Sequence, residues 1–406
     1  MKTFDNSRFA ALLALTTVMS AAGIDGVLPL MPSIGSALNG DRESVQLTLT
    51  MFMLGIAVGQ LIHGPISDRF GRKPAIVGGM IMTSAATAGC ALSMSIEMLA
   101  AFRFIHGLGA SSGWLVARAI IRDRHEHDDA ARVMSLMMVF HSAAPLFAPI
   151  IGAALTVTLG WEAMFVFLSV YSLSVSIFFS AVFTETISNK ALDALDLGPI
   201  LRNFREIAGV GTFWAYTGCA TAAYGILFAF LSASADVIIV HLKQPELHYS
   251  YMFAGVMIGS VSGMLMGARL VARFGGDRLL RWGVILAAAF GVVLASLAWA
   301  RVDHWFAVMG PMAFCMVAFA LIFPQSIAGV LQPFPHVAGA ASSLVGFIQQ
   351  LVGAVTGITV AALSDGSQTS MATGVLFWSL FGFATYFAAV RRYRKIRDTG
   401  QNTFVP

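Results

Sequence analysis

Twelve long apolar segments, separated by short polar stretches, constrain this chain more than any other feature. A helix needs ~20 predominantly apolar residues to cross the hydrocarbon core of a bilayer. The segments fall at residues 9–31, 46–63, 75–95, 98–119, 134–156, 162–183, 210–235, 250–271, 279–299, 305–330, 337–362 and 370–390. Only 11% of the residues are charged, whereas soluble domains carry about a quarter. The chain is therefore predicted to be an all-α polytopic membrane protein, and its first segment is read as an uncleaved span.

The stretch 184–209 separates the twelve segments into two sets of six. It predicts an N-terminal six-helix lobe over 1–183, a cytoplasmic linker over 184–209 and a C-terminal six-helix lobe over 210–406. Apolar residues recur in the linker at helical spacing: Leu197, Ile200, Leu201, Phe204 and Ile207. This pattern is typical of a short amphipathic helix on the inner membrane surface, with a flexible linker as the alternative.

The cations give the predicted orientation. With both termini cytoplasmic, all but four of the 25 lysines and arginines fall at inner ends or inner loops. The exceptions are Arg42, Lys243 and Arg301 at outer ends and Arg103 within a span. The positive-inside rule then predicts a multi-pass protein with both termini on the cytoplasmic side. Because the cations lie at helix ends, the net charge of +4 does not indicate nucleic-acid binding.

The most polar run of the first half is Gly64-Pro65-Ile66-Ser67-Asp68-Arg69-Phe70-Gly71-Arg72-Lys73-Pro74. We expect Gly64-Pro65 to end one helix, Gly71 to allow a turn, and Pro74 to lie in the first turn of the next helix. The pattern G-x-x-x-D-R-x-G-R-K resembles the loop between helices 2 and 3 of major facilitator superfamily transporters. The resemblance implies a gating role for Gly64, Asp68, Arg69, Gly71, Arg72 and Lys73. A plain topology-setting loop is the alternative.

A weaker copy of this run lies between Gly267 and Arg278, in the matching loop of the second half. Two six-helix halves with a repeated loop are typical of a two-lobed alternating-access carrier.

Asp25 is the only carboxylate well inside a predicted span. Such a group normally faces a water-filled cavity or takes up a proton. The run from Ile24 to Pro32 resembles the helix 1 signature of the bicyclomycin- and chloramphenicol-resistance (Bcr/CflA) branch of drug:proton antiporters. That signature has Met-Tyr where this chain has Gly26-Val27. The alternative is that Asp25 only caps a broken helix or pairs statically.

Arg103 is the matching intramembrane cation, and both residues lie ~10 Å below the outer surface at 1.5 Å rise per residue. Helices 1 and 4 are neighbours in the superfamily fold, so a pair or a shared water network is possible. The run from Arg103 to Ala110 resembles the helix 4 motif linked to proton transfer. His106 stands where the branch commonly has glutamine, and either joins the proton relay or only hydrogen-bonds within the bundle. Val116 to Asp123 also resembles the branch, and we expect it to set topology and lobe contacts.

Helix 5 contains the run from Ala144 to Ala153, which resembles the antiporter motif of superfamily exporters. Pro145 and Pro149 would kink the helix, and Gly152 would admit a close neighbour. A generic kinked helix is the alternative. In helix 11, the run from Pro333 to Leu344 again resembles the branch.

Pro335 is expected to start helix 11 on the inner side, with its positive end facing Asp68. In the superfamily this contact locks the outward-facing state.

Aromatic and amide side chains of several spans are candidates for a substrate cavity that accepts an apolar, partly polar guest. They are Trp114, Phe140, His141, Tyr224, Phe228, Phe323, Gln349 and Gln350. Ordinary packing is the alternative for each of them singly.

Together with these features, the resemblance to the Bcr/CflA branch implies a proton-coupled antiporter that exports small amphipathic compounds or drugs across the bacterial inner membrane. The alternative is a proton-coupled uptake symporter for a small metabolite. An enzyme is not expected, because His63, His106 and His141 stand alone on separate helices and Cys90, Cys219 and Cys315 show no metal spacing. We expect a monomer that is driven by the proton gradient, with no cofactor, metal or nucleic-acid partner.

Overall fold

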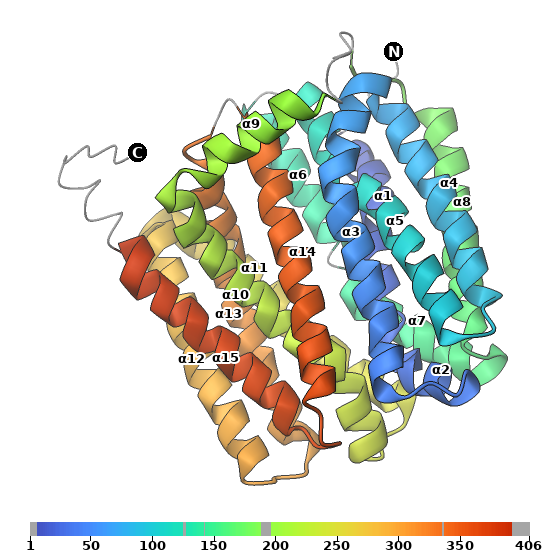
Figure 1. The fold of residues 1–406 in the computed structure, drawn as a ribbon. Helices are drawn as coiled ribbons and strands as arrows, with labels where there is room; N and C mark the ends of the chain where they lie inside the picture. Colours follow the sequence, from blue (N-terminus) through green and yellow to red (C-terminus); the bar gives the residue numbers. More distant parts are fainter. Residues whose placement is uncertain (1–5, 125–126, 142, 188–195, 335–336, 392–406) are drawn as a thin grey trace. The chain divides into compact units, whose positions relative to one another are not determined.

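A computed structural model describes the chain except for residues 1–5, 125–126, 142, 188–195, 335–336 and 392–406 (Figure 1). Its regular structure, over the described residues, is entirely helical. Within the described part of the chain, twelve helical spans are long and apolar enough to cross a membrane: Ser7–Ala37, Arg42–Phe70, Arg72–Ala91, Ile96–Arg124, Leu136–Leu159, Glu162–Val182, Gly211–His241, Glu246–Phe274, Gly276–Trp299, Trp305–Leu331, Ala338–Ala362 and Thr369–Val390. The predicted all-α polytopic architecture of twelve spans is confirmed.

The chain divides into two compact units. The first comprises Met1–Asp196 and Pro245–Ala254. Its helices are α1 (Asn6–Asp25), η1 (Leu28–Leu30), α2 (Met31–Ala37), α3 (Arg42–Phe70), α4 (Arg72–Ala91), α5 (Ile96–Arg124), α6 (His127–His141), α7 (Ala144–Leu159) and α8 (Glu162–Val182). The second comprises Leu197–Gln244 and Gly255–Pro406. Its helices are α9 (Leu197–Ala208), α10 (Gly211–Ala235), η2 (Asp236–His241), α12 (Gly276–Trp299), α13 (Trp305–Leu331), α14 (Ala338–Ala362), α15 (Thr369–Thr385) and η4 (Tyr386–Val390), while α11 (Glu246–Phe274) begins in the first unit and ends in the second.

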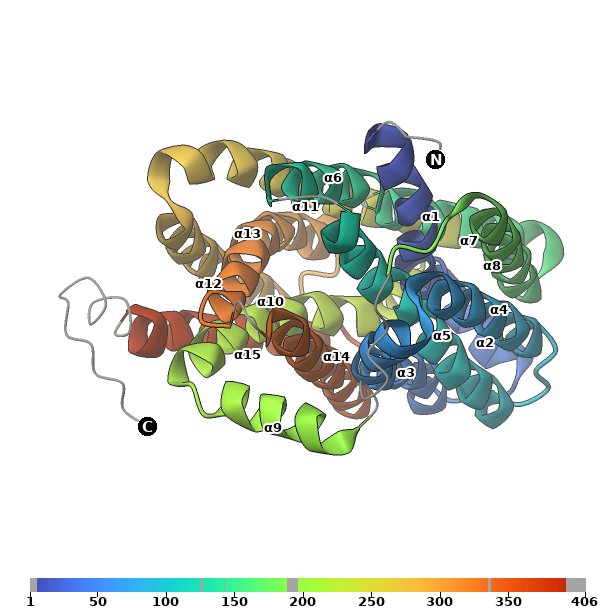
Figure 2. The same ribbon diagram turned by 90° about the horizontal axis from the view of Figure 1, so that it is seen from above.

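Small residues on α5 allow close helix packing in the first unit. A Cβ added at Gly107 would overlap the Phe52 carbonyl oxygen of α3, and one added at Gly113 would overlap the Thr16 carbonyl oxygen of α1. Helices in a membrane gain no hydrophobic free energy from packing together, so their association depends on the van der Waals contact that such close approach allows. The neighbouring α3, α4 and α5 are seen side by side in both views (Figures 1 and 2).

The structure corrects the expectation that Gly64-Pro65 ends the second span. Pro65 lies inside α3, which continues to Phe70. The connection to α4 is Gly71 alone, with φ of 114°, a conformation that glycine adopts without steric cost. Pro74 lies in the first turn of α4, as predicted, because α4 begins at Arg72.

Two further spans depart from the simple prediction. The first is interrupted after Asp25, where α1 gives way to η1 and then α2. The seventh is longer than the predicted 210–235: it continues through η2 to His241 and therefore includes a carboxylate, Asp236.

In the second unit, α10 packs against α13, α14 and α15. The short helix expected in the linker is present as α9. Its Ile207 is fully buried, in one cluster with Phe213, Val330 and Phe334. Figure 2 shows α9 from the side beside the ends of α10 and α14. The apolar face of α9 is thus partly used by its own unit.

The close approach of α3 and α5 predicts the effect of a larger side chain at Gly107. Gly107→Val should force the helices apart and lower the stability of the folded protein by about 1–3 kcal/mol or more, because overpacked cores strain their neighbours. Gly78→Val is the matched control, since a Cβ at Gly78 of α4 meets nothing within 4 Å. The thermal unfolding midpoints of the two purified variants are measured in detergent, and that of Gly107→Val should be the lower one. Equal midpoints would contradict the packing argument.

Candidate functional site

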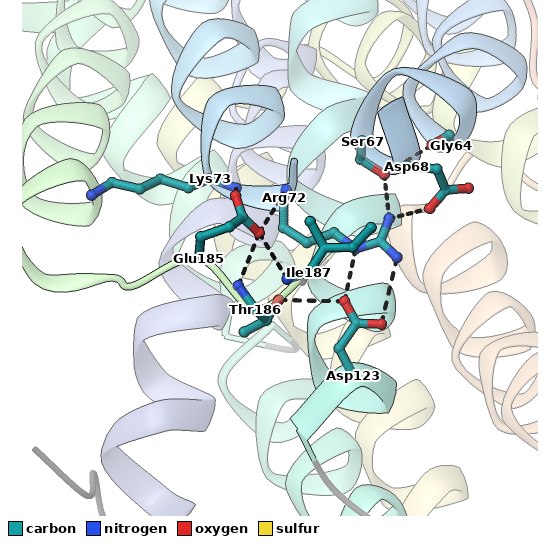
Figure 3. A network of polar contacts seen from close by, with 9 residues as sticks. All are labelled: Gly64, Ser67, Asp68, Arg72, Lys73, Asp123, Glu185, Thr186 and Ile187. Atoms are coloured by element: carbon teal, nitrogen blue, oxygen red, sulfur yellow. Dashed lines mark hydrogen bonds and ion pairs between the residues drawn. The ribbon is translucent and has the colours of Figure 1, made fainter. Parts of the chain in front are cut away.

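The Gly71 turn carries a polar network that joins the ends of three helices (Figure 3). The Arg72 guanidinium turns back over α3, where it donates to Ser67 Oγ at 2.7 Å and pairs with Asp68. Its Nε donates to Asp123 Oδ2, at the end of α5, at 2.8 Å. The Arg72 side chain is only 8% exposed, so this buried cation is matched by two carboxylates, as a desolvated charge requires.

Glu185 completes the network from the segment that follows α8. Its carboxylate oxygens accept the backbone N–H groups of Arg72 and Lys73, each at 3.0 Å. These groups belong to the first turn of α4, where the helix dipole and the unpaired donors favour an anion. Burial raises the pKa of the Glu185 carboxyl, but four backbone N–H groups that donate to it outweigh burial and hold the pKa below its usual value.

Not every cation of this run joins the network. The Lys73 side chain points away from it, and only its backbone N–H takes part (Figure 3). Arg69 lies over the Phe70 ring, with its guanidinium carbon 5.6 Å from the ring centroid. Pro335 and His336, the expected start of helix 11, lie outside the described residues.

A second polar group lies inside the first unit, at the break in its first span. Asp25 is the last residue of α1 and is 7% exposed. Arg103 of α5 is fully buried, and its Nη1 donates to the Gly23 carbonyl oxygen at 2.8 Å. The same Nη1 lies 3.2 Å from His106 Nδ1. The expected proximity of α1 and α5 at this depth is therefore present.

Arg103 binds the backbone rather than the carboxylate of Asp25. Among the described residues, no ion pair within 4.0 Å joins Asp25 to Arg103. The guanidinium lies over the Phe52 ring at 4.1 Å, a contact that partly offsets the loss of hydration. Its Nε and Nη2, and Nε2 of His106, have no hydrogen-bond partner in the protein. Buried donors of this kind are normally satisfied by water or a ligand.

The α7 helix packs directly on the break in the first span. Pro145 lies in its first turn and Pro149 lies within it. A Cβ at Gly152 would overlap the carbonyl oxygen of Gly26, and one at Gly26 would meet the Met164 side chain and the Ala148 carbonyl oxygen. The Pro149 carbonyl accepts a hydrogen bond from Ser250 Oγ at 3.0 Å. Gly26 is therefore required for the α1–α7 contact.

The predicted cavity residues separate into groups. In the first unit, the rings of Trp114 and His141 are 4.9 Å apart, and His141 Nδ1 lies 3.3 Å from Thr17 Oγ1. Arg118 lies over the Trp114 ring at 5.3 Å. Phe140 is 44% exposed and lines a groove with residues of α1 and α8 instead.

In the second unit, the Tyr224 ring lies 5.1 Å from Phe228 and 5.9 Å from Phe323. Gln349 and Gln350 of α14 are buried, and Gln349 Nε2 and Gln350 Oε1 have no partner in the protein. The rings offer apolar surface and the glutamines offer unused amide hydrogen-bonding capacity, the two properties that the sequence analysis expects of a cavity for an apolar, partly polar guest.

Over the part of the chain that the structure describes, no group of three or more His, Cys, Asp or Glu side chains could hold a metal ion. Sequence reasoning missed two functional candidates, Asp123 and Glu185, as partners of the Gly71 turn. A possible signal for Glu185 was that the α4 N-terminus needs an anion and Glu185 directly follows the sixth span.

Comparison with known proteins gives one consistent result. The profile described as Major Facilitator Superfamily matches residues 13–357. The chain is 30% identical to a bicyclomycin resistance protein homolog of Haemophilus influenzae, covering 89% of this chain and 91% of the relative. It is 28% identical to a chloramphenicol resistance protein of Pseudomonas aeruginosa, covering 82% and 78%. A solved bacterial homolog of the human lysosomal transporter Spinster superposes with a TM-score of 0.75 at 16% identity, covering 97% of this chain and 98% of that one.

The Glu185 contact predicts a pH-dependent stability difference. Glu185→Gln removes the negative charge at the α4 N-terminus and should lower stability at pH 7 by about 1 kcal/mol. Because the pKa is lowered on folding, the carboxylate contributes fully above its unfolded pKa of ~4.3 and loses its contribution as the pH falls below that value. The gap between wild type and variant should therefore narrow in acid.

The thermal unfolding midpoint, measured in detergent from pH 7 to pH 3.5, tests this expectation. Glu43→Gln is the control, because Glu43 is an exposed carboxylate in the first turn of α3. A gap for Glu185→Gln that stays constant with pH would show that charge is not the source of the effect.

Proposed function

Because this chain belongs to the major facilitator superfamily and, within it, to the Bcr/CflA branch, we propose that it is a proton-coupled antiporter that exports small amphipathic compounds, drugs among them. Membership makes the chain a membrane transporter rather than an enzyme. The proposal adds the coupling ion, the direction and the cargo. It also places the protein in the bacterial inner membrane as a monomer with both termini cytoplasmic, driven by the proton gradient without a cofactor.

One observation supports the proposal: a buried carboxylate lies at a helix break, two residues after the carbonyl group that binds a buried guanidinium. Asp25 ends α1, and Arg103 is bound to the carbonyl of Gly23, two residues earlier. A carboxylate in that setting is stabilised by gaining a proton when water is withdrawn and by losing it when water returns. Alternating access supplies this change of solvation.

The role proposed for His106 follows from its position. It is fully buried, with Nδ1 at 3.2 Å from Arg103 and Nε2 without a protein partner. A ring held in this way presents one nitrogen for a proton or a water molecule. We assign it to the proton path together with Asp25 and Arg103.

The direction of transport rests on two supports. The relatives that cover most of this chain are named as bicyclomycin, chloramphenicol and multidrug resistance proteins. In addition, the proline-containing α7 packs on the Asp25–Gly26 break. Protonation of Asp25 would therefore act next to the helix whose sequence resembles the exporter motif. The second candidate is an uptake symporter for a small metabolite, and the direction of proton movement separates the two.

The coupling proposal predicts the behaviour of Asp25→Asn. In everted membrane vesicles energised by respiration, chloramphenicol added outside should release protons from the lumen of wild-type vesicles, because it enters in exchange for them. Asp25→Asn cannot carry the proton and should reduce this release at least ~10-fold, as expected when an essential proton carrier is lost. The readout is dequenching of a fluorescent pH-gradient probe.

Glu97→Gln is the matched control, since Glu97 is an exposed carboxylate in the first turn of α5. Full proton release by Asp25→Asn would refute coupling through Asp25. If wild-type vesicles respond to no drug of a diverse panel but take up a metabolite together with protons, the symporter is the correct assignment.

A separate prediction concerns Arg103, whose burial is costly. Arg103→Met replaces a desolvated charge with an apolar chain of similar length and should leave stability unchanged or raise it by about 1–4 kcal/mol. Transport should nevertheless be lost, because the cation beside the Asp25 break is gone. Unfolding midpoints and the vesicle assay are measured on the same preparation. A variant that transports normally would remove Arg103 from the mechanism, and one that unfolds would make it a structural residue.

A further inference from the structure

An apolar groove of about 470 Å³ runs along the first unit between α1, α6 and α8. Its walls include Ala11, Leu15 and Val18 of α1, Phe140 of α6 and Phe178 of α8. Arg8, which is exposed, lines the same groove, and none of the described residues that line it is acidic. The groove is therefore lined by apolar side chains and by one cation, Arg8.

The cation lies at one end of the groove. Arg8 is in the first turn of α1, and Val182, which also lines the groove, is the last residue of α8. From Arg8 to Val18 the helix rises ~15 Å, which is half of the ~30 Å hydrocarbon core of a bilayer. The groove is thus as long as the hydrocarbon region of one leaflet, with Arg8 at headgroup depth.

One further feature indicates a formed site. The Tyr171 hydroxyl of α8 donates to the Leu15 carbonyl oxygen at 2.8 Å, which fixes α8 against α1 beside the groove. The cation Arg8, with no acidic residue among the described lining residues, complements an anionic headgroup.

We infer that the groove binds one acyl chain of an anionic phospholipid, with the phosphate at Arg8. The chain fills the apolar wall between α1 and α8, where each buried methylene adds affinity, and Arg8 selects lipids by charge. Phosphatidylglycerol should be preferred to phosphatidylcholine about fivefold, the ratio that one cation near a charged surface contributes. This inference is independent of the proposed coupling and cargo.

Native mass spectrometry of the detergent-purified full chain tests the site. The protein is titrated with dioleoylphosphatidylglycerol, dioleoylphosphatidylcholine and oleate. Wild type should retain phosphatidylglycerol about fivefold better than phosphatidylcholine. Arg8→Gln should bind both lipids equally, since the groove persists without its cation. Ala11→Phe fills the groove and should reduce retention of both lipids.

Matched controls separate the groove from the general lipid-facing surface. Arg122→Gln removes an exposed cation near the end of α5, and Ile177→Phe adds bulk at an exposed position of α8 that does not line the groove. Neither should alter retention. If Ala11→Phe does not elute as a folded monomer, Val18→Phe takes its place.

Three results would overturn the assignment. They are equal retention of the two phospholipids by wild type, an unchanged preference in Arg8→Gln, and undiminished binding in the filled-groove variant. Displacement of phosphatidylglycerol by equimolar oleate would instead assign the groove to free fatty acids.

Discussion

Close backbone contact along α5 is the interaction on which the first unit depends. Gly107 and Gly113 bring α5 against the backbones of α3 and α1, so that no side chain separates the helices there. Arg103 and His106 lie three residues apart on one side of α5, just before Gly107, and both are fully buried. Because lipid offers no hydration, a guanidinium in that position needs a hydrogen-bond acceptor from a neighbouring helix. The Gly23 carbonyl, near the end of α1, is that acceptor.

The same physical problem is solved differently at the Gly71 turn. Arg72 is also desolvated, but there it is met by Asp68 and Asp123 and by the Ser67 hydroxyl. Glu185 occupies the adjacent helix N-terminus and leaves the first turn of α4 satisfied. The buried charge of Arg72 and the N-terminus of α4 are therefore both matched by carboxylates of the same unit. By contrast, Arg103 and His106 retain unpaired donor capacity, which buried groups normally satisfy with water or a ligand.

Local signals in the sequence were sufficient for the spans, for Gly71 as a turn and for the closeness of Arg103 to the end of α1. Propensity failed at Pro65, which α3 accommodates because neighbouring helices and local adjustments re-satisfy the backbone in membrane proteins. Contacts between residues far apart in the sequence could not be predicted from local patterns. Arg72 finds Asp123 51 positions away and Glu185 113 positions away, and no helical or strand period relates such pairs. For Arg103, the sequence correctly predicted the neighbouring helix, α1. It did not predict the bonding partner, which is the backbone carbonyl of Gly23 rather than the Asp25 carboxylate.

That choice of partner bears on how a proton carrier could work here. A carboxylate in a direct ion pair with Arg103 would have to break a charge-assisted bond each time it took up a proton, and the guanidinium would then be left buried and alone. Binding Arg103 to the Gly23 carbonyl removes this penalty, since the carbonyl accepts the bond whatever the state of Asp25. Asp25 is then free to titrate with its solvation, and the Gly26–Gly152 contact places α7 directly on the residue that follows it. In the proposed antiporter, the fixed cation and the variable carboxylate thus act at one helix break without being bonded to each other.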